Sequence, residues 1–82
     1  MELQQQIQEM IAENSGLEAA DVADVDADLF AAGLSSLDCV RVLLAIEDEL
    51  DLELPSEKID REMFSTVNKL TAAVTEALGA TA

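Results

Sequence analysis

Apolar residues recur at steps of three and four positions at the start of the chain, which is the pattern of an amphipathic helix. These positions are Leu3, Ile7, Met10 and Ile11. The run Asn14-Ser15-Gly16 follows them and is a typical helix stop. The pattern therefore predicts a first helix over roughly residues 2–14.

Residues 15–35 show no sustained period. A few apolar residues are scattered here among four aspartates and several alanines: Val22, Val25, Leu29 and Phe30. We expect a long loop that a few apolar anchors fix to the core. A connection of this length in a small domain is uncommon and often functional.

The pattern changes at Ser35, because Ser35-x-x-Asp38 resembles a helix-starting capping box with the shorter acid. It predicts a second helix that ends at about Leu50. The apolar residues of this helix form two stripes: Cys39, Leu43, Ile46 and Leu50 on one face, and Leu37, Val40 and Leu44 on another. The second stripe is a candidate for a surface that the core leaves uncovered, although periodicity alone allows both stripes to be buried.

Pro55 predicts a short helix near residues 56–61, with Ser56 as its cap and Ile59 pointing inward. Ser65 or Thr66 then begins a last helix that stops at Gly79. Its apolar positions are Val67, Leu70, Val74 and Leu78. With no strand pattern, repeat or linker, we expect one all-α domain over residues 1–82. It is a bundle of three main helices plus one short helix, with the long loop between the first two helices.

Composition limits the function. Four basic and eighteen acidic side chains give 82 residues a formal charge of −14, which repels nucleic acid and anionic lipid and favours basic protein partners. The first ten residues lack the basic and apolar blocks of a signal peptide, and no apolar run is long enough to span a bilayer, so we expect a cytoplasmic protein. An acidic helical adaptor that binds a basic protein without any modification is one function that fits these features.

Catalytic and metal sites are not indicated. The chain has no histidine and no glycine-rich phosphate loop, so we expect no enzyme, and the single Cys39 is interpreted as a core residue. Asp24, Asp26 and Asp28 resemble the start of a calcium loop. However, Leu29 and Ser35 occupy the positions where that loop needs glycine and glutamate, so we expect no metal site.

The adjacent serines are the strongest chemical candidates. If Ser35 caps the second helix, Ser36 is its first residue, with an exposed hydroxyl where backbone N–H groups and the helix dipole favour a negative group. Gly33 allows the tight turn before them. A phosphate ester on Ser36 would thus be well placed.

These residues resemble a known family, the acyl carrier proteins, whose hallmark is Asp-Ser-Leu at the start of the second of four helices. The resemblance covers essentially the whole chain and is strongest in the run Asp28-Leu29-Phe30-x-x-Gly33-Leu34-Ser35-Ser36-Leu37-Asp38. It implies that Ser36 carries 4′-phosphopantetheine, which a phosphopantetheinyl transferase takes from coenzyme A. It further implies a monomer that holds acyl groups as thioesters. Its partners would be a cargo-loading ligase or transferase and downstream acyl-using enzymes with basic docking surfaces.

The resemblance also implies that the second helix docks onto these partners. The docking residues would be Leu37, Asp38, Val40, Arg41, Leu44, Glu47 and Asp48. Ser35 stands where the family usually has aspartate, and Arg41 where fatty-acid carriers usually have an acid, which indicates different partners. The A-G-L-S-S opening and the R-x-x-F-S run at Arg61 are similar to carriers of amino acids and to some polyketide or peptide carriers. A specialised acyl or aminoacyl pathway is therefore the main hypothesis, and housekeeping fatty-acid synthesis is the alternative.

Overall fold

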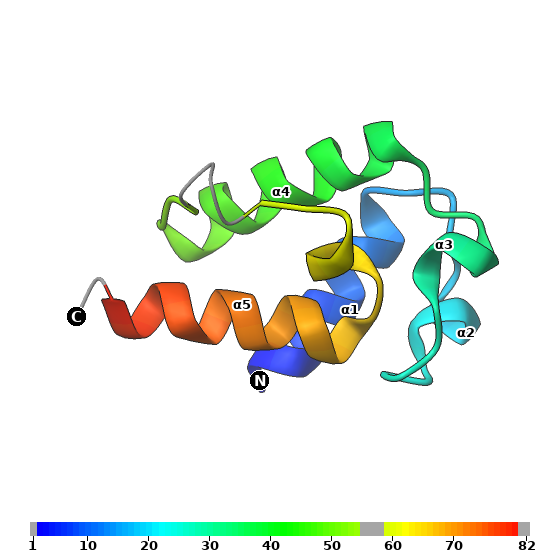
Figure 1. Ribbon diagram of the computed structural model, residues 1–82, viewed down its shortest axis with the longest axis horizontal. Helices are drawn as coiled ribbons and strands as arrows, with labels where there is room; N and C mark the ends of the chain where they lie inside the picture. The colour runs from blue at the N-terminus through cyan, green and yellow to red at the C-terminus, as the bar shows by residue number, and fades with distance from the viewer. Residues whose placement is uncertain (1, 55–58, 81–82) are drawn as a thin grey trace.

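The computed structural model describes residues 2–54 and 59–80, and within these ranges the regular structure is entirely helical. The three long helices are α1 (Leu3–Glu13), α4 (Ser36–Leu50) and α5 (Val67–Ala80). The three short ones are α2 (Ala19–Val22), α3 (Leu29–Ala32) and the 3₁₀ helix η2 (Glu62–Phe64). The predicted all-α fold with three main helices is confirmed. Figure 1 shows α4 and α5 on opposite sides of the molecule, with α2 and α3 together at one end.

Helix α1 matches the predicted range to within one residue at each end. Its apolar face, Ile7, Met10 and Ile11, is buried. The helix ends at Asn14, whose backbone N–H and side-chain Nδ2 both donate to the Met10 carbonyl oxygen, at 3.0 and 2.8 Å. α1 contacts both α4 and α5 and is therefore the element around which the other long helices pack.

The expectation of a loop without helices over residues 15–35 was wrong, because α2 and α3 lie within it. Each is a single turn started by a side chain. Glu18 and Asp21 form a capping box at α2, and the Asp28 carboxylate accepts the N–H groups of Phe30 and Ala31 at α3. A single turn contributes too few residues to produce a helical period in the sequence, so periodicity missed both.

The long connection is held in place from α1 and α5. The Asn68 side chain donates to Asp26 Oδ1 and accepts from Gln4 Nε2, both at 2.6 Å, while its backbone N–H donates to the Val25 carbonyl oxygen at 3.0 Å. The Leu29 N–H donates to the Ser65 carbonyl oxygen at 2.8 Å. The predicted apolar anchors of the connection are confirmed: Val22 and Leu29 are buried, and Val25 and Phe30 are partly buried. The segment before α4 is therefore fixed.

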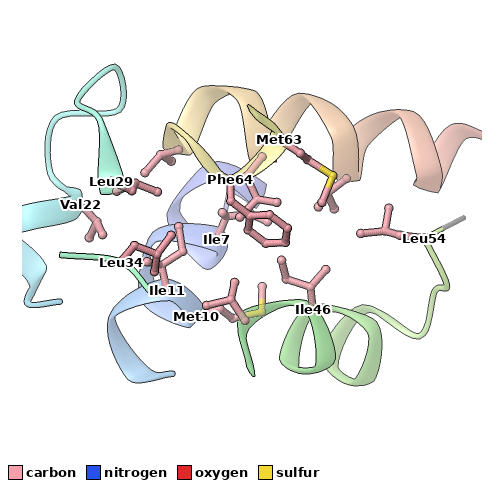
Figure 2. Packing of buried hydrophobic residues seen from close by; sticks show 14 of the residues in the cluster. Ile7, Met10, Ile11, Val22, Leu29, Leu34, Ile46, Leu54, Met63 and Phe64 are labelled. Atoms are coloured by element: carbon pink, nitrogen blue, oxygen red, sulfur yellow. The ribbon is translucent and has the colours of Figure 1, made fainter. Parts of the chain in front are cut away.

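The core is aliphatic apart from Phe64, which lies in the middle of the cluster between Ile7 and Ile46 (Figure 2). α4 buries Val42 and Ile46 completely and Cys39, Leu43 and Leu50 in part. The predicted inward stripe is thus confirmed, although the sequence pattern left out Val42. The other stripe of α4 does not enter the core.

Between α4 and α5 the structure differs from the prediction. Pro55 and Ser56 lie outside the described residues, and residues 59–61, the described part of the predicted helix, are not helical. A 3₁₀ turn follows instead, because Asp60 Oδ1 accepts the Met63 N–H at 2.8 Å and so starts η2 at Glu62. Ile59 is partly buried against the core, as expected.

Helix α5 begins as predicted, because Thr66 Oγ1 accepts the Lys69 N–H at 3.0 Å. Its predicted apolar face is buried at Val67, Leu70 and Val74 and partly buried at Leu78. The predicted stop at Gly79 was wrong, since the helix continues to Ala80. A glycine costs a helix only about 1 kcal/mol, so one in the last turn does not have to end it.

The turn from α3 to α4 depends on Gly33. The Gly33 N–H donates to the Phe30 carbonyl oxygen at 3.1 Å and the Leu34 N–H donates to the Leu29 carbonyl oxygen at 2.9 Å. These are the two bonds of a Schellman motif. Gly33 has φ +120°, a conformation that side chains with a Cβ rarely adopt. The turn brings the chain directly to Ser35.

We expect Gly33→Ala to lower the free energy of unfolding by about 1–2 kcal/mol, because alanine is strained at this φ. The strain is conformational, since the nearest atom to an added Cβ would be Leu17 Cδ2 at 3.9 Å. Gly16→Ala is the matched control: an added Cβ there meets nothing within 4 Å, and its φ is not in the left-handed region. Chemical denaturation measures both, and equal effects of the two substitutions would contradict the prediction.

Candidate functional site

Helix α4 starts with a reciprocal pair of hydrogen bonds. Ser35 Oγ accepts the Asp38 N–H at 3.1 Å, and Asp38 Oδ2 accepts the Ser35 N–H at 3.0 Å. This is the predicted capping box, with Ser35 in an extended conformation before the helix. The cap uses the hydroxyl of the first serine and leaves that of the second available.

The box also sets the charge at the start of the helix. The hydrogen bond from the Ser35 backbone, then the one from its side chain, lowers the pKa of the Asp38 carboxyl below 3.8, and the positive charge of Arg41 adds to this effect. Asp38 is thus ionised at neutral pH, where the positive end of the helix dipole stabilises it.

Ser36 is the first residue of α4 and is exposed. Within the part of the chain that the structure describes, its hydroxyl has no hydrogen-bond partner. The backbone N–H groups of Ser36 and Leu37 likewise lack an acceptor among these residues. The position thus offers an accessible nucleophilic oxygen beside donors that suit an anionic substituent.

The second stripe of α4 is exposed along most of its length. Leu37, Val40 and Leu44 are 58%, 51% and 60% exposed, and are the large hydrophobic residues with high exposure in the described ranges. Arg41 and Asp48 are exposed on the same helix. Exposed apolar side chains that form one continuous stripe indicate a protein-docking surface. We call Leu37, Val40 and Leu44 the α4 stripe.

Glu47 is placed differently from the exposed docking residues. It is partly buried, and its Oε2 accepts the Leu54 N–H at 3.1 Å, while its carbonyl oxygen accepts the Leu52 N–H at 3.2 Å. Glu47 therefore holds the segment after α4 against the helix. Periodicity could not show this, because the bond depends on how the chain turns after Asp51, which has φ +51°.

Cys39 is partly buried, as its assignment to the core predicted. Burial raises the pKa of its thiol above 9.0, and the Asp38 charge raises it further. The thiol is therefore protonated at neutral pH and is a poor nucleophile. It packs against the core at the start of α4.

The aspartates of the connection serve local structure. Asp24 Oδ1 accepts the Asp26 N–H at 3.0 Å. Asp26 Oδ1 accepts a hydrogen bond from the Asn68 side chain, and Asp28 caps α3. No group of three or more acidic, cysteine or histidine side chains among residues 2–54 and 59–80 is placed to hold a metal ion. In the same ranges, none of the helices has the length and apolar character needed to cross a membrane.

Comparison with known proteins identifies the family to which the chain belongs. The sequence profile described as "Phosphopantetheine attachment site" matches residues 5–74, most of the chain. The chain belongs to this family of carrier proteins. Its members are carriers and not catalysts, and the cofactor that they bear is covalently attached 4′-phosphopantetheine.

Carriers of amino acids are among the relatives. The chain is 33% identical over 78 residues to the D-alanyl carrier protein of Latilactobacillus sakei, covering 93% of this chain and 97% of that protein. It is 40% identical over 53 residues to the aminoacyl carrier protein of Agrobacterium fabrum. That alignment covers 65% of this chain and just under two thirds, 63%, of the relative.

The fold is also shared with a solved carrier. A chain in the crystal structure of an engineered Bradyrhizobium japonicum glycine:[carrier protein] ligase, complexed with carrier protein from Agrobacterium tumefaciens and ATP, superposes with a TM-score of 0.80. The identity is 31%, over 92% of this carrier and 99% of that chain. The corresponding complex with AMP gives a TM-score of 0.77 and 32% identity.

The pH dependence of stability tests the capping box. Because the folded pKa of Asp38 is lowered, its charge stabilises the fold above pH 3.8, and this contribution is lost as the pH falls through the folded value. We expect Asp38→Asn to be less stable than the wild type at neutral pH, with the difference shrinking below pH 3.8. Denaturation at a series of pH values measures it. Asp48→Asn removes a charge from the same helix and is the control; a difference for Asp38→Asn that does not vary with pH would contradict the expectation.

Proposed function

We propose that Ser36 is the attachment residue for 4′-phosphopantetheine, and that the protein carries aminoacyl groups in a specialised biosynthetic pathway, acting as a monomer in the cytoplasm. The observation that carries the proposal is the exposed Ser36 hydroxyl at the start of α4, beside a serine that already caps the helix. When attached, the group supplies a flexible arm ending in a thiol that holds cargo as a thioester.

Three features of α4 favour Ser36 over Ser35. The Ser35 hydroxyl accepts the Asp38 N–H, so esterifying it would remove a hydrogen bond that starts the helix. Ser36 lies inside the first turn, where N–H groups and the dipole favour the negative charge of a phosphodiester. The ordered turn at Gly33 also keeps the Ser36 oxygen in a fixed place.

The names of the relatives support amino acids as cargo. D-alanyl and aminoacyl carriers align with this chain, and the structural neighbour comes from a complex with a glycine:[carrier protein] ligase. A ligase that activates an amino acid with ATP is therefore the loading partner that we propose, after a phosphopantetheinyl transferase has modified Ser36 from coenzyme A. The relatives give housekeeping fatty-acid synthesis less support, and the family assignment disfavours an unmodified adaptor.

The α4 stripe is the docking surface in this proposal. Its three apolar residues lie within about two turns of Ser36, so a partner that covers the stripe has its active site close to the base of the arm. Arg41 and Asp48 would set the charge pattern that the partner must match, with Asp38 at the end of the stripe. Glu47 would contribute through the shape of the segment that it holds, because one of its oxygens is already bonded.

Loading tests the attachment residue. After incubation with coenzyme A and a phosphopantetheinyl transferase, the wild type and Ser35→Ala should each gain the mass of one phosphopantetheinyl group, and Ser36→Ala should gain none. Intact-protein mass spectrometry measures this. Ser35→Ala should also lose about 0.5–2 kcal/mol of stability through its lost cap. Loading of Ser36→Ala would disprove the assignment.

Aminoacylation of the loaded carrier tests the docking surface. Leu44→Ser should lower kcat/KM with the loading ligase by about tenfold, because burying a leucine in an interface contributes about 1.5 kcal/mol or more. Stability should change by less than about 0.5 kcal/mol, since Leu44 is mostly exposed. Ala72→Ser, at an exposed apolar position on α5, is the control. An unchanged kcat/KM for Leu44→Ser would remove Leu44 from the docking surface.

A further inference from the structure

Arg61 lies at a defined place beside the start of α4. Its guanidinium carbon is 4.0 Å from the centre of the Phe30 ring, which belongs to α3 and therefore precedes the turn into α4. The hydrogen bond from the Leu29 N–H to the Ser65 carbonyl oxygen fixes α3 to the end of η2. In Figure 1 the segment leading into η2 lies between α4 and α5. The stacking thus positions an exposed cation next to the α3–α4 turn.

The acids next to Arg61 in the sequence are engaged elsewhere. Asp60 accepts the Met63 N–H, and Glu62 pairs with Lys69 at 3.0 Å. Within residues 2–54 and 59–80, Arg61 has no carboxylate partner. Stacking on a ring uses only the face of the guanidinium, so its N–H groups remain able to donate in the plane. Arg61 is thus a positioned cation that has no anionic partner among the described residues.

The stacking on Phe30 places Arg61 beside the turn that leads into Ser35 and Ser36. Its positive charge also lowers the pKa of the Cys39 thiol, against the larger effect of burial, which agrees with a position near the start of α4. Cys39 follows Ser36 by three residues and is rotated from it by only about 60° around the helix. Arg41, in contrast, is rotated by about 140° from Ser36. Arg41 is therefore an exposed arginine on α4 that points away from Ser36 and serves as the comparison.

We propose that Arg61 binds the phosphodiester that attachment creates at Ser36. This inference rests on the proposed function. The guanidinium donates hydrogen bonds to the non-bridging phosphate oxygens and draws the base of the arm toward the Cys39 side of α4. The α4 stripe lies on a different side of the helix and stays free for docking. Arg61 is therefore a positioning residue that sets the direction in which the arm leaves the carrier.

The strength of this contact suits a carrier. Both groups are accessible to solvent, so the pair is weak and is screened by salt. A partner enzyme can therefore draw the arm away from Arg61 at little cost. The contact holds the arm between encounters and does not compete strongly with delivery.

A cycle of loading and mutation tests the proposal. The wild type, Arg61→Gln, Arg61→Lys and Arg41→Gln are each prepared unloaded and loaded, with loading at Ser36 verified by mass spectrometry, and all are melted at low ionic strength. The change in Tm on loading should be about 2–4 °C more favourable in the wild type and Arg41→Gln than in Arg61→Gln. Arg61→Lys should keep most of this difference, because it keeps the charge. Comparing each variant with its own unloaded form cancels any direct effect on folding.

A spectroscopic readout is independent of stability. On loading, the Nε–H resonance of Arg61 should shift while that of Arg41 stays in place. The proposal would be overturned if loading changed the Tm of Arg61→Gln and Arg41→Gln equally. It would also be overturned if the Nε–H resonance of Arg61 did not shift on loading. A chain that does not load at Ser36 would instead overturn the proposed function, and mass spectrometry reveals this before any melting experiment.

Discussion

The site depends on the reciprocal pair of hydrogen bonds between Ser35 and Asp38. Each group satisfies a backbone N–H of the other, so the helix starts without any contribution from the Ser36 side chain. Two adjacent serines thereby acquire different chemistry: one is a structural acceptor, and the other is an exposed hydroxyl in the first turn. The turn at Gly33 and the fixed α3 ahead of it hold that hydroxyl at one place on the surface, as the proposed attachment of a tethered arm requires.

The sequence predicted the long helices and this box because both are local. Each long helix repeats its apolar period over several turns, and the box needs only residues three apart. The short helices escaped prediction because a single turn has no period and is stabilised by contacts with distant parts of the chain. Asn68 on α5 illustrates this, since it holds Val25 and Asp26 in the connection and Gln4 on α1 at once. No local pattern marks an asparagine for that role.

At the site, too, local sequence patterns were predictable and contacts between distant residues were not. Two apolar stripes on one helix made Leu37, Val40 and Leu44 a candidate for an uncovered surface, but periodicity also allowed both stripes to be buried, and the exposure is seen only in the folded chain. The inward bond of Glu47 and the stacking of Arg61 on Phe30 depend on turns that only the folded chain defines. Arg61 belongs to the R-x-x-F-S run, which indicated a resemblance to carriers of amino acids. The run could not predict the contact of Arg61 with Phe30, because Phe30 is distant in the sequence.

Helix α4 thus divides its surface among three tasks. Val42 and Ile46 anchor it in the core, its first turn presents the exposed Ser36 hydroxyl, and the α4 stripe faces solvent. The stripe consists of only three exposed apolar residues, and burying each contributes only about 1.5 kcal/mol. Such a surface supports weak and transient binding. A carrier that visits several enzymes in turn needs this property, because a tighter interface would hold the loaded arm at the first partner.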